Sequence, residues 1–347
     1  MSRAMGAANI LDLKVELEGQ DLTGRLFEQV RDITARVRPR LVSLSITDKR
    51  AGEADQLDLV LDDSDGKMAL PREGARLRVW LGWKQGKDVT PGLVDKGSFI
   101  VDEVSHEGAP DRITIRARSA DVAGSLRTRR ERSWHDSTIG AIVADIARRN
   151  RLRPQCAASL SGIRVEFQAQ SRESDMALLR RLGREHDAVA TVKDGKLIFA
   201  PIGAGTTAGG RPIPAGTIHR RAGDRHSYQL RKREEAKGVT AAWHDRDGAR
   251  QRTVTVGEQS GARRLSRVYG SEAEARRAAG AARSRAARGE RKLSFDLALG
   301  RADLYPERTV RVSGFKPEID AVSWLIVEVS HKVDGQGFTT SLQMEGV

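Results

Sequence analysis

The chain is short of cysteine, of aromatic residues and of long apolar runs, and each shortage excludes a class of protein. Cys156 is the only cysteine, so neither an intrachain disulfide nor a zinc site of several cysteines can form. Aromatic residues make up 4% of the sequence, too few for a platform that stacks single-stranded nucleic acid. No stretch approaches the roughly 18 apolar residues of a membrane span. The first ten residues also lack the apolar centre of a signal peptide. We therefore expect folding in a cytoplasm and no stable membrane insertion.

Length and charge set broader bounds on the protein. The 347 residues are enough for two or three domains, and 39% hydrophobic with 31% charged residues fits a somewhat polar soluble protein. The net charge of +13 permits binding to polyanions without establishing it. Arginines dominate the positive charge and concentrate at residues 127–132 and 263–291. We interpret them as a solvated basic face or a basic subunit contact, and Cys156 as a small apolar residue beside a loop.

One hairpin pattern occurs twice in the sequence. Residues 99–106 and 112–117 alternate between apolar and polar side chains around a turn at 108–111, as in an antiparallel hairpin. Residues 324–331 and 338–344 repeat this arrangement around a second turn. The tetrapeptide Glu-Val-Ser-His begins at 103 in the first hairpin and at 328 in the second. The shared tetrapeptide in the same place of the same hairpin predicts a duplicated β domain.

The first 130 residues are predicted to form the first copy of this domain. Besides the hairpin, alternation predicts strands at 11–18, 41–48, 56–63 and 76–83. Residues 22–38 are ambiguous and have room for a short helix. About six strands with one apolar face each predict a closed or sandwich-like antiparallel barrel.

The period changes within residues 131–205, which we assign to an α/β insert. A helix over 138–150 has Asp136 or Ser137 as its expected N-cap, and a second helix begins near Ser174. A strand at 162–167 lies between them. An Asp-Gly turn at 194–195 joins a closing hairpin of strands 189–192 and 196–199.

Residues 206–347 are predicted to form the second barrel. Its expected strands are 227–233, 237–244, 251–257, 292–299 and 309–312, together with the second hairpin. Ser271 and Glu274 form a capping box that opens an Ala/Arg-rich helix to about residue 288. Its thin apolar face predicts that the helix lies flat on a sheet or a neighbour. The fold class is therefore α+β, mainly β, with two antiparallel barrels and an insert between them.

Three patterns suggest chemistry, and none of them has its required context. His-Asp pairs occur at 135–136, 186–187 and 244–245, but they fall at element ends, where Asp136 as a helix cap explains one of them. The glycine cluster at 203–210 lacks the Gly-Lys-Ser/Thr ending of a phosphate-binding loop and no helix follows it. Two carboxylates would suffice for a glycosidase, yet nothing singles out a pair. We assign no catalytic, metal-binding or cofactor-binding residue.

Several longer motifs carry a resemblance to a known family. They occupy residues 55–63, 81–83, 96–104, 115–121, 129–136, 173–182, 192–197 and 312–316. In this order they are similar to the late control protein D family of contractile phage tails. The segment 173–182 is also similar to the N-terminal half of VgrG spike proteins. The resemblance covers roughly residues 10–347.

The resemblance implies a structural baseplate hub and no enzyme. In that family two barrels related to tail-tube subunits lie in each chain, and a homotrimer forms a pseudo-hexameric ring that joins the six-fold tail tube to the three-fold central spike. The implied partners are the spike as a separate chain, the tube protein, other baseplate proteins and the tape measure protein, with DNA only as cargo. The implied location is the virion or a tail-like particle. Two domains in each of three chains agree with a six-fold ring.

The hairpins at 99–117 and 324–344 are our candidates for the subunit contacts. Two other functions stay open at this point. A tail-associated peptidoglycan hydrolase would clear a zymogram as an isolated chain. A DNA-binding late-gene regulator would bind DNA tightly and with strong salt dependence.

Overall fold

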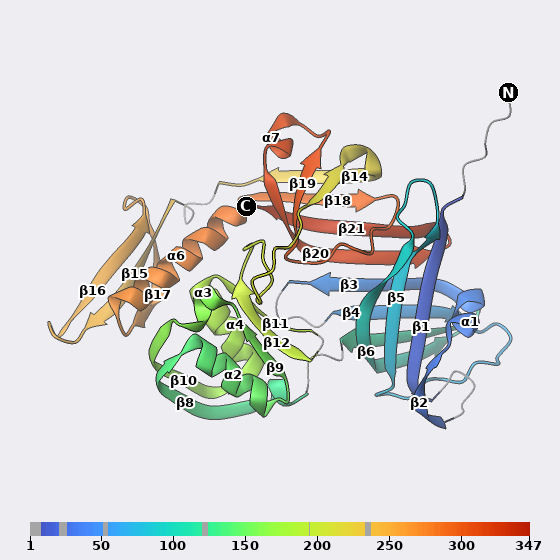
Figure 1. Ribbon diagram of the computed structural model, residues 1–347, viewed down its shortest axis with the longest axis horizontal. Helices are drawn as coiled ribbons and strands as arrows, with labels where there is room; N and C mark the ends of the chain where they lie inside the picture. The colour runs from blue at the N-terminus through green and yellow to red at the C-terminus, as the bar shows by residue number, and fades with distance from the viewer. Residues whose placement is uncertain (1–7, 21–25, 51–54, 120–123, 194, 233–236) are drawn as a thin grey trace.

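Alternating strands dominate the computed structural model, which describes residues 8–20, 26–50, 55–119, 124–193, 195–232 and 237–347. Two β domains lie edge to edge in Figure 1, with an α/β insert below them and a smaller sheet with one long helix at the far side. The mainly β fold class is therefore confirmed.

The first β domain follows the apolar alternation of its sequence. Leu57, Leu59 and Leu61 point to one side of their strand and are fully buried, while the residues between them stay accessible. This domain contains β1 (Ile10–Gln20), β2 (Leu26–Asp32), α1 (Thr34–Val37), β3 (Leu41–Lys49), β4 (Gln56–Asp62), β5 (Arg76–Gln85), β6 (Gly92–Glu107) and β7 (Arg112–Ser119). The predicted strands are all present, and the short helix falls within the ambiguous segment.

The insert wraps its own core with helices and strands. Its elements are β8 (Arg129–Thr138), α2 (Ile139–Arg149), β9 (Arg153–Cys156), α3 (Ala158–Ser161), β10 (Arg164–Ser174), α4 (Asp175–His186), β11 (Ala188–Lys193) and β12 (Lys196–Pro201). Apolar residues of α2 and α4 meet β11 and β12 in one cluster. The second helix, α4, begins near Ser174 as predicted, and Ser174 caps it. The cap of α2 is Thr138, so the prediction of Asp136 or Ser137 is wrong. Of the expected Asp-Gly turn, residue 194 lies outside the described residues.

The second β domain repeats the strand order of the first. It contains β13 (Gly216–His219), β14 (Gly223–Leu230), β18 (Arg291–Leu297), β19 (Thr309–Ser313), α7 (Pro317–Asp320), β20 (Ser323–Asp334) and β21 (Gly337–Gly346). Hydrogen bonding runs in the order β14-β18-β21-β20-β19-β13, and the first domain has the order β3-β4-β7-β6-β5-β1. The two orders correspond strand for strand, and this supports the duplication predicted from the repeated hairpin. The last pair differs in direction, because β13 runs parallel to β19 whereas β1 runs antiparallel to β5.

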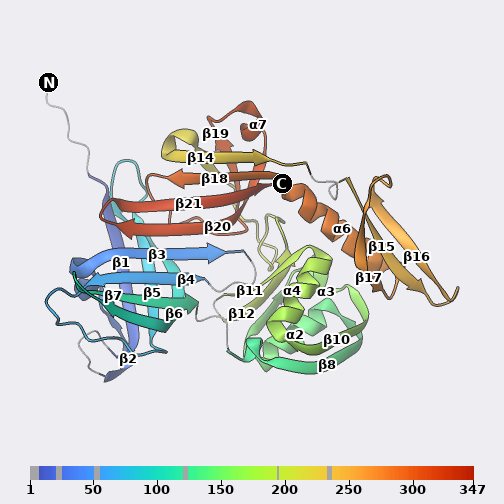
Figure 2. The same cartoon turned by 180° about the vertical axis from the view of Figure 1, so that it is seen from behind.

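Two strands predicted for the second barrel, 237–244 and 251–257, belong to a separate unit. There β15 (Gly238–Asp245), β16 (Arg250–Gly257) and β17 (Arg263–Tyr269) form their own three-stranded sheet. The Ala/Arg-rich helix α6 (Glu272–Arg288) lies along that sheet, as Figure 2 shows from behind. Ala275, Ala278 and Ala279 are buried in the cluster between them. Alternation predicts a strand with one buried face, but not the sheet to which the strand belongs.

The predicted closed barrels are not confirmed. Among the described residues, thirteen strands of both β domains join in one open sheet. The cause is the edge of β20, which pairs with β3 of the first domain. An edge that pairs with a neighbouring domain is satisfied without closure of its own sheet.

Candidate assembly interface

The residues that suggested chemistry lie apart and in structural roles. His135 is in β8, where its Nε2 lies 3.2 Å from Ser133 Oγ. Asp187 ends α4 and forms an ion pair with Arg288, and Asp245 is 2.7 Å from Arg252. Within the described part of the chain, no group of three or more histidine, cysteine, aspartate or glutamate side chains has the arrangement of a metal site.

Cys156 and the glycine cluster also have structural explanations. Cys156 ends β9, and burial raises the pKa of its thiol to about 11. A thiol with that pKa is protonated at neutral pH and is a poor nucleophile. In the glycine cluster, the Gly203 amide donates a hydrogen bond of 3.1 Å to the Glu307 carboxylate. That bond attaches the loop to the second β domain.

The two hairpins share a further feature that the sequence did not show. Both carry a β-bulge directly before Glu-Val-Ser-His, with Asp102 as the extra residue in β6 and Val327 in β20. Beyond the bulge the pairing is also the same. In each hairpin the valine pairs with a residue of the second strand, and the histidine pairs with the residue two positions before that one. A bulge bends a strand and increases its twist. The repeated unit is therefore a bent hairpin with one shape.

Of the two hairpins, the second makes a contact between domains within the chain. From Glu328 to Asp334, β20 pairs antiparallel with β3, and the Thr47 and Ser330 hydroxyl oxygens lie 3.3 Å apart across this junction. Val333 and Phe338 at the hairpin tip enter the hydrophobic core of the first domain. The junction thus combines a backbone ladder with shared apolar burial, the two contributions that hold strands inside a single domain.

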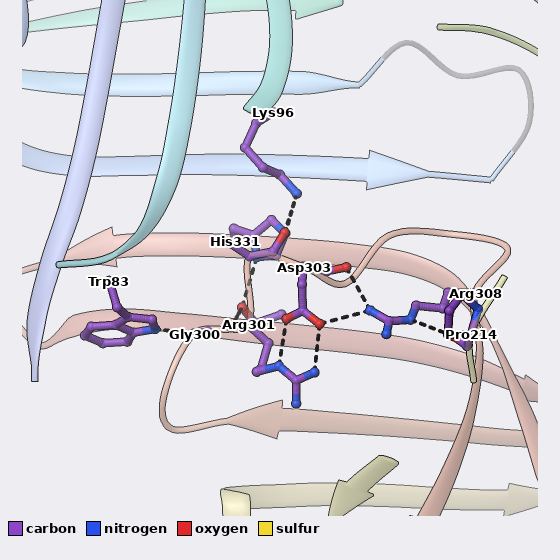
Figure 3. A network of polar contacts seen from close by, with 10 residues as sticks. Trp83, Lys96, Pro214, Gly300, Arg301, Asp303, Arg308 and His331 are labelled. Atoms are coloured by element: carbon purple, nitrogen blue, oxygen red, sulfur yellow. Dashed lines mark hydrogen bonds and ion pairs between the residues drawn. The ribbon is translucent and has the colours of Figure 1, made fainter. Parts of the chain in front are cut away.

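A chain of polar contacts crosses the same junction (Figure 3). The Lys96 ammonium of β6 donates to His331 Nε2 at 2.9 Å, and His331 Nδ1 lies 2.9 Å from the Thr340 hydroxyl. Burial, followed by the charge of Lys96, lowers the pKa of His331 well below its usual value. The imidazole is therefore neutral, accepts from Lys96 and donates to Thr340. Burial also lowers the pKa of Lys96, to about 8.

The loop between β18 and β19 completes this contact. Trp83 Nε1 donates to the Gly300 carbonyl at 2.8 Å, and the Trp83 ring packs on Phe338 with 5.4 Å between centroids. Asp303 accepts from Arg301 at 2.7 Å and from Arg308 at 2.9 Å (Figure 3). Burial alone would raise the pKa of Asp303, but the two guanidinium groups outweigh burial and lower this pKa to about 2. The loop is therefore held at both ends.

A network of ion pairs joins all parts of the chain beside the junction. Arg50, just after β3, contacts Glu307 and lies 2.5 Å from Glu345. Arg288 of α6 is 3.2 Å from the same Glu345 and also pairs with Asp187 of the insert. These groups are largely withdrawn from solvent, where an ion pair resists screening but a lone charge is costly. The network fixes both β domains, α6 and the insert relative to one another.

A second contact connects the insert to the junction. Lys193 of β11 lies 3.2 Å from Asp48 of β3. Burial, followed by the charge of Asp48, raises the pKa of neighbouring Asp55 to about 7. Burial disfavours the charged form of a carboxylate, and the second carboxylate beside it acts in the same direction.

The face of the shared sheet that points away from the cores carries polar side chains, with acidic and basic groups side by side. Its ion pairs join neighbouring positions on the strands, with Arg116 2.8 Å from Glu103 and Lys332 2.7 Å from Asp334. Serine and threonine hydroxyls line β3 between them. At these positions acidic and basic groups neutralise each other.

Sequence reasoning identified the hairpins but not their partners. Lys96, Arg50 and Asp303 carry no local signature, because an isolated charged residue between apolar ones is typical of any half-exposed strand or loop. Their roles depend on groups from distant segments.

None of the helices in the described residues is long and apolar enough to cross a membrane.

Comparisons with known proteins agree along nearly the whole chain. A family model described as phage tail baseplate hub (GPD) matches residues 55–337. The probable baseplate hub protein of Escherichia phage 186 is 44% identical over 356 residues, which cover 91% of this chain and 90% of that protein. The tail protein of Neisseria meningitidis MC58 has the same fold, with a TM-score of 0.67 at 12% identity and 96% of each chain covered. One chain of a Francisella PdpA-VgrG complex matches with a TM-score of 0.53 at 7% identity, over 97% of this chain and 58% of that chain.

Proposed function

The chain belongs to the phage tail baseplate hub family, and from this premise we propose that three copies form the closed ring at the centre of a tail baseplate. Membership confirms the resemblance carried by the sequence motifs, and with it a role as a structural hub in the virion. The trimer, its symmetry and its contacts are the further step proposed here.

One observation carries this proposal: the β20–β3 junction joins two similar domains, one after the other, into a single sheet. The junction is heterologous, because it joins the edge of one domain copy to a different edge of the other. Heterologous contacts repeat head to tail and form a ring when the rotation closes. Two domains in each of three chains give a ring of six similar domains, which matches a six-fold tube on one side and a three-fold spike on the other.

The polar face of the shared sheet would line the channel of this ring. DNA would pass as cargo along a wall whose charges are already paired, so no strong phosphate contacts would retain it. The insert and the α6 unit lie on one side of the shared sheet and would contact other baseplate proteins (Figure 1).

The proposed mechanism is mechanical and does not include catalysis. The ring holds the spike, nucleates the tube and moves with both when the sheath contracts. The buried ion network and the shared core would keep the two domains of each chain together under that load.

The deciding experiment is a mass measurement of the full-length chain, purified together with the spike protein of the same phage or prophage. We expect three hub chains in each complex and three-fold or pseudo-six-fold class averages in negative stain. Any other stoichiometry would overturn the ring.

Two assays address the competing functions. A zymogram of the isolated chain on peptidoglycan should show no clearing. A DNA titration at physiological salt should stay flat, whereas a salt-dependent isotherm with a sequence preference would favour the regulator.

A further inference from the structure

The junction between neighbouring chains can be specified residue by residue, provided that the proposed ring is correct. We infer that residues 103–107 of β6 in one chain pair antiparallel with β14 of the next chain, in the register that β20 and β3 adopt within the chain. The partner is thus a second copy of the same chain, and the contact repeats the internal junction.

The argument begins with the correspondence of the strands. Val104 and Val329 occupy the same place after the repeated bulge, and they lie opposite Ile115 and Leu342. The next strands continue the match, because Ile115 pairs with Leu59 and Leu342 pairs with Phe295. The two sheets therefore correspond position by position up to this strand.

The last strand of each set follows from the same ladder. Leu59 pairs with Leu44 of β3, and Phe295 pairs with His226 of β14. Two and four residues further along both strands, Tyr228 corresponds to Ile46 and Leu230 to Asp48. β14 is therefore the counterpart of β3.

Each of these two edges lacks the neighbour that its counterpart has. Among the described strands, residues 103–107 of β6 pair only with β7, and β14 pairs only with β18. Side chains at equivalent positions of the two domains consequently differ in exposure. His331 is 0% exposed, whereas the His106 side chain is 42% exposed. Leu230 is 55% exposed, and Asp48 at the equivalent place is 7% exposed. An open strand edge presents unpaired backbone N–H and C=O groups and so invites pairing with another chain.

Transfer of the internal register gives complementary pairs. Glu328 lies opposite Lys49 with 4.0 Å between their charged groups, and the corresponding residues between chains are Glu103 and Arg231. Val329 opposite Asp48 becomes Val104 opposite Leu230, so the exposed leucine gains an apolar neighbour. An opposite-charge pair and an aliphatic pair at directly facing positions both favour this register.

The tip of the first hairpin differs from that of the second. Gly108 and Asp111 stand where Val333 and Phe338 enter the neighbouring core. The contact between chains therefore lacks the apolar anchor of the internal junction, and the strand ladder contributes most of it. This difference fits a contact that forms between separate chains after each has folded.

Cysteine cross-linking tests the register directly. In a Cys156→Ser background, Ser105→Cys with Gln229→Cys places one cysteine on each edge, at the positions equivalent to Ser330 and Thr47. Mild oxidation of the assembled full-length chain should give roughly ten-fold more covalent multimers than either single-cysteine variant, up to a closed trimer, because facing strand positions lie within disulfide reach. Reduction should return the monomer.

Two controls make this test independent of folding defects. Thr47→Cys with Ser330→Cys should close within one chain, because these hydroxyl oxygens are already 3.3 Å apart. Ser105→Cys with Ser227→Cys shifts the register by two residues and should cross-link several-fold less. Glu103→Arg should weaken assembly, and addition of Arg231→Glu should restore it.

The outcomes separate this inference from the proposed ring. A particle of three chains that never cross-links between 105 and 229, or that prefers the shifted pair, overturns the inferred edge and leaves the ring intact. A chain that stays monomeric with its spike overturns both.

Discussion

At the scale of single residues, buried polar groups without a partner mark where the molecule carries a cost. His186 at the end of α4 is the clearest case, because its Nδ1 is buried and has no hydrogen-bond partner among the described residues. Burial, and then the charge of Arg277, lowers the pKa of His186 to about 4. Its place in a His-Asp pair suggested chemistry, but the surroundings disfavour any charge on the ring.

Replacement of this histidine should reduce the sensitivity of the chain to acid. The folded-state pKa of about 4 lies below the unfolded value, so the unfolded chain binds more protons between pH 6.5 and 4 and stability falls as pH falls through that window. For the half-buried ring we expect about 1 kcal/mol of loss at pH 5. His186→Leu should remove it, as measured by urea midpoints at pH 7 and pH 5. His244→Leu, at an exposed histidine, is the control; an unchanged pH slope in His186→Leu would contradict the argument.

At the scale of elements, the helix caps show how local geometry selects among similar residues. Asp136, Ser137 and Thr138 all have side chains suited to an N-cap. Thr138 alone accepts the Ala141 amide, at 3.1 Å, because its backbone is extended and the helix begins at the next residue. Asp136 has a positive φ of 43° within β8.

The cap assignment predicts a difference between adjacent substitutions. Thr138→Ala should destabilise the insert by about 1 kcal/mol, because the Ala141 amide loses its acceptor. Ser137→Ala next to it should change stability by less than roughly 0.5 kcal/mol. Thermal unfolding of the two full-length variants decides the assignment, and the reverse ranking would restore the cap predicted from sequence.

At the scale of the whole molecule, the seam between the two β domains organises the chain. The open sheet, the core shared through Phe338 and the ion network of Arg50 all meet there. The two hairpins predicted from sequence therefore differ in use. The second pairs with β3 within the chain, and the first would be available to a neighbouring chain in the proposed ring.

Removal of the central cation should loosen this seam. Arg50→Met leaves Glu307 and Glu345 without their shared partner, and the burial that raises the pKa of Glu307 makes its uncompensated charge costly. We expect a loss of about 3 kcal/mol, measured by denaturant unfolding. Lys332→Met breaks an exposed ion pair on the same sheet and should cost less than about 1 kcal/mol. Equal losses would show that the network does not hold the domains together.

Most of the strands and helices, and the duplication, could be predicted from local sequence patterns. Alternation and capping report interactions between residues a few positions apart, so strands such as β4 and the start of α4 were predictable. The repeated Glu-Val-Ser-His marked the duplicated hairpin because both copies keep the same bulge and pairing.

Which strand edges meet depends on contacts between distant segments. The contact of Thr47 with Ser330 joins positions 283 residues apart. The strands β15, β16 and β17 form a separate sheet outside the second domain, although their residues alternate like those of the other strands. The physical reason is that a buried apolar face requires an apolar neighbour but does not determine which segment of the chain supplies it. Unpaired edges and matching register, which exist only in the folded chain, select the partner.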